Sequence, residues 1–376
     1  MKEKILEEFR RRFDTSPELY ASSGRINLIG EHTDYNEGYV FPGAIDKVIM
    51  AAIAPNGSDM VRVYSMDIGE YAEFGLREED APEQSWARYI FGVCREILKR
   101  GGEVKGFDAV FAGNVPLGAG LSSSAALESC FAFALDDMFN CNRIGKLTLA
   151  RIGQSTEHNY CGVKCGIMDQ FASIMGKKGK LIRLDCRSMD YEYFPFAPEE
   201  YELLLVDSKV KHELADSPYN KRRESCERVA NKLGLPSLRE ATKEMLDRIR
   251  DDISAEDYSR AKFVIEEKER VLAVSDALLA RDYETVGRKM YETHDGLSKD
   301  YEVSCEELDF LNDLARENRV TGSRIMGGGF GGCTINLIKK DQTEAFIAKV
   351  KEKFAERYGH EPAFYPVVIS DGARRV

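Results

Sequence analysis

A glycine- and serine-rich stretch joins a predicted strand at residues 107–111 to a predicted helix at 122–139. It reads Pro116-Leu117-Gly118-Ala119-Gly120-Leu121-Ser122-Ser123-Ser124-Ala125-Ala126. Glycines allow a backbone to wrap closely around a ligand, and hydroxyls at a helix start lie beside its unpaired N–H groups. The stretch therefore favours an anion cradle, most usefully for phosphates. An ordinary strand-to-helix turn capped by serine is the alternative.

This stretch lacks the signatures of two common nucleotide-binding loops. It has no Gly-Lys-Ser/Thr, which a P-loop requires, and it has no third glycine at the spacing of a dinucleotide-binding fingerprint. Neither of those two families is therefore indicated.

A polar loop bounded by glycines follows an apolar strand within residues 24–38. Glu31, His32 and Asp34 are crowded into this loop, and such a cluster can hydrogen-bond several hydroxyls of a sugar. None of the other histidines is spaced to join His32 in a metal site. A solvated polar loop, with Arg25 in a surface ion pair, is the alternative.

A third motif places an acid among apolar neighbours, in the run Cys165-Gly166-Ile167-Met168-Asp169-Gln170-Phe171. A carboxylate is expensive to bury unless it is paired, so Asp169 is either a helix-opening cap or a working acid or base. Glu157 and His158 lie just upstream on a predicted helix at 147–160. Glu157 is either a solvated helix residue or a ligand for magnesium.

A fourth motif has five glycines around one aromatic residue, Gly327-Gly328-Gly329-Phe330-Gly331-Gly332-Cys333. So many glycines before a predicted strand indicate a backbone that approaches a ligand or another domain. A flexible turn is the alternative.

The alternation of strands and helices predicts an α+β protein of two domains. An apolar strand at 201–206 follows a proline-containing stretch, and we place the domain boundary there, between residues 1–200 and 201–376. We expect strands within 19–53 and at 107–111, 201–206, 333–338 and 363–369. We expect helices at 3–13, 86–98, 122–139, 147–160, from about 167, and at 218–234, 255–280, 282–298, 305–318 and 341–357.

Composition and charge limit the classes of partner. Of the 376 residues 43% are hydrophobic and 31% are charged, as in soluble globular proteins. The formal net charge of −11 argues against nucleic acid as a polymeric partner. The nine cysteines are scattered along the chain, which predicts reduced thiols and a cytoplasmic location. The sequence shows no apolar leader and no long apolar run, so we expect neither secretion nor contact with a membrane.

Together and in this order, the motifs resemble those of the GHMP kinase family, and specifically of its galactokinases. Residues 24–38 resemble the galactokinase signature, the serine-rich loop resembles the second, ATP-phosphate motif, and residues 327–333 resemble the third. The resemblance runs nearly end to end. Mevalonate and homoserine kinases share the second and third motifs, whereas the first is more particular to galactokinases and close sugar-kinase relatives.

The resemblance implies a fold and a reaction. The fold has an N-terminal α/β domain and a C-terminal ferredoxin-like α+β domain, with the active site between them. The reaction is ATP-dependent phosphorylation of the anomeric hydroxyl of α-D-galactose to galactose 1-phosphate, the entry step of the Leloir pathway. A related sugar-1-kinase for N-acetylgalactosamine or arabinose, or a non-catalytic galactose and ATP sensor, is the alternative. We expect a monomer or a weak oligomer.

The resemblance also assigns roles to individual residues. Asp169 is expected to be the catalytic carboxylate, with Arg25 as its partner. ATP and Mg²⁺ are the expected co-substrate and metal ion. The sugar is expected to contact Glu31, His32, Asp34, the backbone of Gly166, and Tyr219. The nucleotide is expected to contact Trp86, Gly118, Gly120, Ser122, Ser123 and Ser124. The ligands expected for Mg²⁺ are Ser123 or Ser124, and Glu157.

Overall fold

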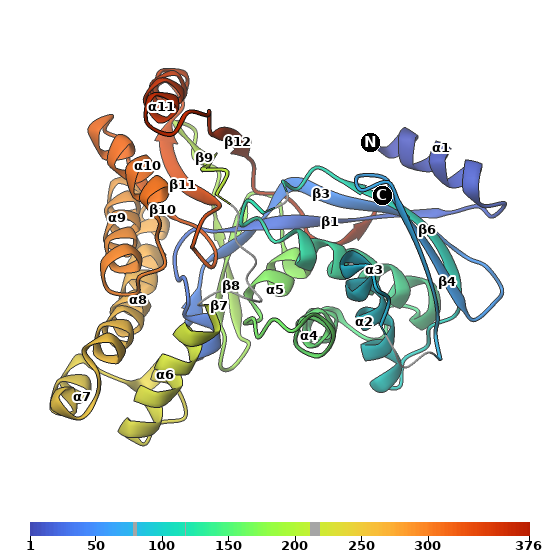
Figure 1. Ribbon diagram of the computed structural model, residues 1–376, viewed down its shortest axis with the longest axis horizontal. Helices are drawn as coiled ribbons and strands as arrows, with labels where there is room; N and C mark the ends of the chain where they lie inside the picture. The colour runs from blue at the N-terminus through green and yellow to red at the C-terminus, as the bar shows by residue number, and fades with distance from the viewer. Residues whose placement is uncertain (78–80, 117, 211–218) are drawn as a thin grey trace.

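The computed structural model describes residues 1–77, 81–116, 118–210 and 219–376, and its elements form two groups (Figure 1). One group contains a large sheet with helices on both faces, and the other contains a smaller sheet beside a row of long helices. Leu117 of the serine-rich stretch and position 218 of a predicted helix lie outside the described residues.

The large sheet has six strands in the order β13-β1-β3-β6-β4-β5. Neighbouring strands are antiparallel except β4 and β6, which are parallel. Apart from its first residue β1 is buried throughout, because helices cover both faces of the sheet. The strands are β1 Glu18–Asn27, β3 Pro42–Pro55, β4 Met60–Ser65, β5 Glu70–Gly75, β6 Phe107–Gly113 and β13 Arg374–Arg375.

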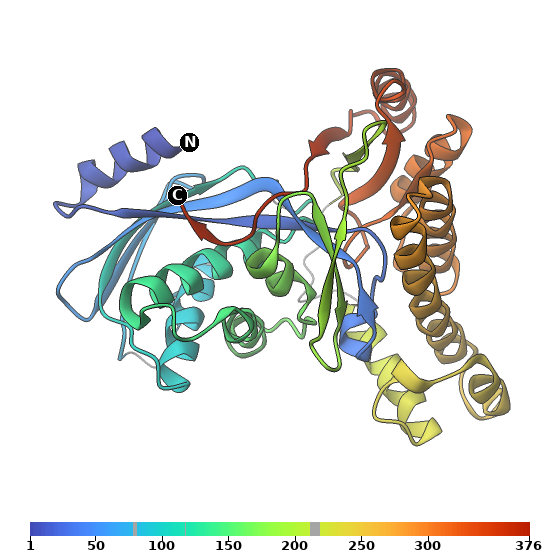
Figure 2. The same ribbon diagram turned by 180° about the vertical axis from the view of Figure 1, so that it is seen from behind.

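Helices pack on both faces of this sheet. Helix α1 (Lys2–Arg12) packs on one face through Ile5 and Phe9, at apolar spacing four. Four helices cover the opposite face (Figures 1 and 2). They are α2 Ser85–Lys99, α3 Ser123–Asn140, α4 Lys146–Thr156 and α5 Met168–Met175. Helix α3 begins inside the serine-rich stretch, so its N-terminal end lies at the site described below.

A three-stranded antiparallel sheet stands between the two groups, as Figure 2 shows. Its strands are β2 Tyr39–Val40, β7 Lys180–Asp185 and β8 Tyr191–Pro195. Because β2 directly follows the polar loop that holds Glu31, His32 and Asp34, pairing of β2 with β7 fixes one end of that loop.

The smaller sheet has the antiparallel order β10-β11-β9-β12, which is the strand order of a ferredoxin-like βαββαβ unit. The predicted α+β class with a ferredoxin-like part is therefore confirmed. The strands are β9 Tyr201–Asp207, β10 Gly322–Ile325, β11 Cys333–Lys339 and β12 Ala363–Val367. The helices of this group are α6 Tyr219–Leu233, α7 Lys243–Arg248, α8 Ala255–Leu279, α9 Tyr283–Lys299, α10 Glu306–Glu317 and α11 Thr343–Tyr358.

One hydrophobic core continues from the large sheet into the small one. Leu203 and Leu205 of β9 belong to the same buried cluster as β1 and β3, whereas Leu204 and Val206 face α10 and α11. Strand β13 returns at the end of the chain to pair with β1. The boundary at residue 200 stays a prediction.

Most predicted elements are confirmed with ends shifted by a few residues. The helix predicted at 147–160 differs, because regular α-helix ends at Thr156 and a π-helical turn, η2 (Glu157–Cys161), follows. No element was predicted from the sequence at β4, at β5, at the β7–β8 hairpin, at α7, at β10 or at β13. Within the described ranges, no helix is both long enough and apolar enough to span a membrane.

Candidate active site

A cleft of about 200 Å³ opens where the sequence motifs meet. Its walls come from β1, the polar loop, the start of α3, the segment before α5, the start of α6 and the glycine-rich loop, residues 327–333. Trp86 is a predicted site residue that does not line it. The predicted residues that do line it are Arg25, Glu31, His32, Asp34, Gly118, Gly120, Ser122, Ser123, Ser124, Glu157, Gly166, Asp169 and Tyr219.

The centre of the cleft is an ion pair between Arg25 of β1 and Asp169 in the first turn of α5. Arg25 Nε lies 2.7 Å from Asp169 Oδ1, and Arg25 Nη2 lies 2.8 Å from Oδ2. This two-point geometry fixes both side chains. Arg25 is only 4% exposed, and its third nitrogen donates to the carbonyl of Gly120 in the serine-rich stretch. The pair therefore connects the sheet, α5 and the serine-rich stretch.

The serine-rich stretch turns sharply into α3. Ser122 has a left-handed backbone, with φ 56°, and its hydroxyl donates to the Asp169 carboxylate. Ser123 and Ser124 are the first residues of α3. The first N–H groups of a helix have no partner within it, and with the helix dipole they favour an anion. The end of α3 that meets the cleft is thus suited to phosphate.

Two buried acids lie behind this helix start. Ser124 Oγ donates to Glu157 Oε1 at 2.9 Å, and burial raises the pKa of Glu157 to about 7. Glu128 of α3 is fully buried, and Gln170 Nε2 donates to it at 3.1 Å. Burial, followed by the charge of Glu157, raises the pKa of Glu128 well above its ordinary value. In the protein alone both acids therefore bind their proton more tightly than an exposed glutamate does.

The polar loop, residues 30–38, is named the sugar loop after its predicted ligand. Glu31 is buried and accepts two hydrogen bonds at Oε1, from Arg324 Nη1 at 3.1 Å and from the backbone N–H of Gly327 at 2.9 Å. Arg324 of β10 is fully buried and also donates to the carbonyls of Asn27 and Leu28. Glu31 and Arg324 thereby join the sugar loop to the glycine-rich loop.

Asp34 packs directly on Gly166. An added Cβ at Gly166 would lie 1.8 Å from Asp34 Oδ2, so only glycine leaves room for this carboxylate. Asp34 Oδ1 accepts from the backbone N–H of Tyr35 at 2.9 Å. Burial raises the pKa of Asp34 to about 7, and the charge of Asp169 adds to this shift.

Aromatic side chains form the remaining wall. The ring of His32 lies 5.4 Å from that of Tyr219 and 4.8 Å from that of Tyr301, between centroids. His32 Nδ1 shares a hydrogen bond of 2.7 Å with the hydroxyl of Tyr35. Burial, followed by the charge of Arg222, lowers the pKa of His32 to about 3, which keeps the imidazole neutral.

The predicted site and the cleft in the structure differ at three residues, namely Trp86, Glu128 and Arg324. The indole of Trp86 donates to Glu70 Oε2 at 2.8 Å and packs on Phe111, and its expected place near adenine stays a prediction. Glu128 and Arg324 were missed. The sequence held one signal for Arg324, because it is the last charged residue before the glycine-rich loop.

The chain matches three family descriptions. Residues 7–55 match "Galactokinase galactose-binding signature", residues 88–177 match "GHMP kinases N terminal domain", and residues 274–356 match "GHMP kinases C terminal". Fold and site thus define the class of the GHMP kinases. A mevalonate kinase structure from Methanococcus jannaschii shares the fold, with a TM-score of 0.66 at 16% identity.

Closer relatives narrow this class. A galactokinase of Thermotoga petrophila is 43% identical across 94% of this chain and 98% of its own, and one of Clostridium acetobutylicum is 38% identical across 100% and 98%. The structure of Lactococcus lactis galactokinase complexed with galactose has a TM-score of 0.94 at 35% identity, and the match covers 99% of this chain and 98% of that one. The chain belongs to the galactokinase family.

Replacement of Arg324 by methionine is expected to destabilise the fold strongly. The change leaves Glu31 buried with one hydrogen bond fewer, and it leaves three backbone carbonyls, those of Asn27, Leu28 and Ile325, without this donor. Loss of one partner from a buried ion pair typically costs about 3–5 kcal/mol of unfolding free energy. Urea denaturation of the Arg324→Met variant and the unchanged protein measures the difference.

The matched control is Arg11→Met, because Arg11 pairs with Glu8 on the surface of α1 and its side chain is 67% exposed. Such a pair contributes less than about 1 kcal/mol. If Arg324→Met lost no more stability than Arg11→Met, the proposed link through Glu31 would be wrong.

The stability of the protein without ligands is expected to depend on the protonation of Asp34. Its pKa is about 7 when folded, against an ordinary value of 3.8, so the folded protein binds this proton more tightly than the unfolded chain. The resulting stabilisation is complete below about pH 4 and is lost as the pH rises through 7. Melting temperatures from pH 5 to pH 8 should therefore fall more steeply for the unchanged protein than for Asp34→Asn. Parallel curves for the two proteins would contradict this assignment.

Proposed function

We propose that this cleft transfers the γ-phosphoryl group of ATP to the anomeric hydroxyl of α-D-galactose. The observation that carries the proposal is the position of Arg25. Its guanidinium bonds Asp169 beside the sugar loop and the Gly120 carbonyl in the serine-rich stretch. A sugar hydroxyl and a phosphate held by these two neighbouring segments would meet at Asp169.

Buried and half-buried acceptors support recognition of the sugar. Glu31 and Asp34 present carboxylates, His32 presents a neutral ring, and the backbone of Gly166 lies against Asp34. We assign these residues, with Tyr219, to the sugar hydroxyls. A site with buried acceptors penalises a misplaced hydroxyl strongly, because the acceptor is then left unpaired. We therefore assign selection of the axial 4-hydroxyl to this group, and to Asp34 in particular.

The start of α3 supports recognition of the phosphates. Gly118 and Gly120 have positive φ values of 75° and 72°, which lets the backbone curve around a ligand at this point. We assign Ser122, Ser123 and Ser124 to the same anion, because they stand where the helix leaves its N–H groups unpaired.

The oxygen donors beside Ser124 fit a magnesium ion. Magnesium prefers hard oxygen ligands and usually binds one or two carboxylates together with substrate phosphates. The hydroxyl of Ser124 and the carboxylate of Glu157, 2.9 Å apart, match that preference, and Ser123 is the alternative hydroxyl. When bound, the ion supplies positive charge to the phosphates. Glu157 would hold it in the ionised form, which a nearby cation favours.

Transfer then depends mainly on position and charge. Asp169 accepts the proton of the anomeric hydroxyl as the sugar oxygen bonds to the γ-phosphorus, and the bond to the ADP oxygen breaks. Arg25 holds Asp169 at two points and adds positive charge near the phosphoryl group. In phosphoryl transfer such positioning and charge stabilisation account for most of the rate enhancement. We retain a monomer or weak oligomer and a cytoplasmic location as predictions.

ADP release in the presence of ATP and Mg²⁺ tests this function. The assay compares five phosphoryl acceptors: galactose, N-acetylgalactosamine, arabinose, glucose and mevalonate. We expect turnover with galactose. Replacement of Asp169 by alanine or asparagine should lower kcat by roughly 10²–10⁴-fold, which is the usual contribution of a general base.

The comparison requires that the Asp169 variants are folded, which a melting temperature close to that of the unchanged protein would show. A folded variant with unchanged kcat would refute Asp169 as the base. Turnover with another sugar alone would keep the mechanism and change the substrate, whereas ligand binding without turnover on any substrate would indicate a sensor.

A further inference from the structure

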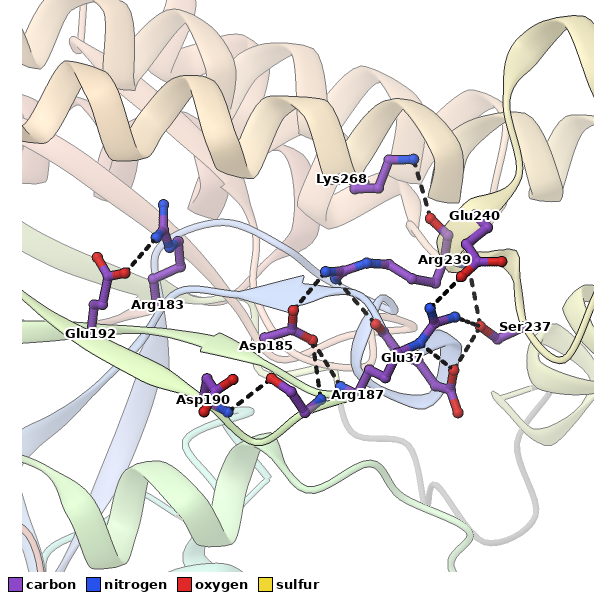
Figure 3. Close-up of polar contacts among 11 residues, drawn as sticks. Glu37, Arg183, Asp185, Arg187, Asp190, Glu192, Ser237, Arg239, Glu240 and Lys268 are labelled. Carbon is purple, nitrogen blue, oxygen red and sulfur yellow. Dashed lines mark hydrogen bonds and ion pairs between the residues drawn. The ribbon is translucent and has the colours of Figure 1, made fainter.

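We infer that Arg239, assisted by Arg187, is a positioning residue that fixes the sugar loop from outside the cleft, an inference that rests on the proposed function. Three segments that are distant in sequence converge behind this loop (Figure 3). They are the end of the sugar loop at Glu37, the turn after β7, and a 3₁₀ turn, η4 (Leu238–Glu240).

Arg239 makes contacts with two of these segments at once. Its Nη1 donates to the carbonyl of Glu37 at 3.2 Å, and its Nη2 donates to Asp185 Oδ2 at 2.6 Å. Its guanidinium also lies over the ring of Tyr39, 3.7 Å from the centroid. The Arg239 side chain is 13% exposed, so water screens these contacts less than it screens surface ion pairs.

Arg187 adds a second set of contacts to the same end of the loop. Its Nε donates to Glu37 Oε2 at 3.0 Å, and its Nη1 donates to Glu240 Oε1 at 2.6 Å. Ser237 Oγ donates to Glu37 Oε2 at 3.0 Å. The side chains of Arg187 and Glu37 are 34% and 42% exposed, and exposed pairs contribute little. We therefore assign the larger effect to Arg239.

The position of Glu37 determines the position of Asp34. Both belong to one tight turn, in which the backbone N–H of Glu37 donates to the carbonyl of Asp34 at 3.1 Å. Glu37 has a left-handed backbone, with φ 58°, a conformation that persists only when the surroundings impose it. The turn is closely bonded within itself, because two further backbone N–H groups donate to the carbonyl of Thr33, at 3.1 and 2.8 Å. A displacement of Glu37 is therefore passed on to Asp34, and the attachment of Glu37 to Arg239 determines where the Asp34 carboxylate stands in the cleft.

Arg239 does not line the cleft, so its removal should affect one substrate selectively. In Arg239→Ala we expect the KM for galactose to rise about tenfold, since small misplacements of a binding group are costly, while the KM for ATP changes less than about twofold. Arg239→Lys should recover part of the affinity for galactose, because an ammonium group can still reach one of the two acceptors.

The matched control is Arg183→Ala. Arg183 lies on β7, in the same β7–β8 hairpin as Arg187, and its Nη2 pairs with Glu192 Oε1 at 3.0 Å. Figure 3 shows this pair apart from Glu37. Its loss should leave both KM values unchanged. An equal rise of the galactose KM in Arg183→Ala, or equal rises of both KM values in Arg239→Ala, would overturn the inference.

Hydrogen exchange of the protein without ligands tests the inference independently of the activity. In Arg239→Ala the amides of residues 36–38 should exchange faster, whereas those at the start of α3 should be unchanged. Arg183→Ala should leave both regions unchanged. Unaltered exchange at 36–38 in Arg239→Ala would overturn the inference. Absence of turnover with galactose in the unchanged protein would instead reject the proposed function.

Discussion

The buried guanidinium of Arg25 sets the arrangement on which the cleft depends. It extends from β1 to Asp169 at the start of α5 and to the carbonyl of Gly120. A cation removed from water is tolerated only when its hydrogen-bond donors are paired. The serine-rich stretch and α5 must therefore place their acceptors against this guanidinium. Ser122 is held in a left-handed conformation and donates to the same carboxylate, which is the kind of local strain that functional sites retain. Asp169 is thereby held at the point where the sugar loop and the serine-rich stretch meet.

The sugar loop is held at both of its ends by cations from the second half of the chain. Inside the protein Arg324 bonds Glu31, and outside the cleft Arg239 bonds the carbonyl of Glu37. The two arginines differ in burial, since Arg324 is fully buried and Arg239 retains some contact with water. We therefore expect Arg324 to affect mainly stability and Arg239 to affect mainly the affinity for sugar. The loop joins the two groups of elements, so we expect the affinity for sugar to depend on how the two groups pack.

Much of the site could be predicted because its signals are local. Glycines and serines around Ser122, and acids between apolar residues as at Asp169, are informative within a few positions. The contacts of Arg324 and Arg239 could not be predicted in this way, because they depend on sheet register and on packing between distant segments. Trp86 illustrates a different limit. An aromatic residue on an apolar helix face has the same pattern whether it packs in the core or beside a ligand, and here the indole bonds Glu70.

We expect Arg25 and Asp169 to act as one unit, because the guanidinium bonds the carboxylate at two points. The most direct measurement is a double-mutant cycle on kcat/KM for the sugar, with Arg25→Met, Asp169→Asn and the double variant, each checked for folding by its melting temperature. Residues that act together lose their effect together. If the two side chains act together, the double variant is about as slow as the slower single variant. If the fold-losses of kcat/KM in the two single variants multiplied in the double variant, Arg25 and Asp169 would act independently, which would contradict this expectation.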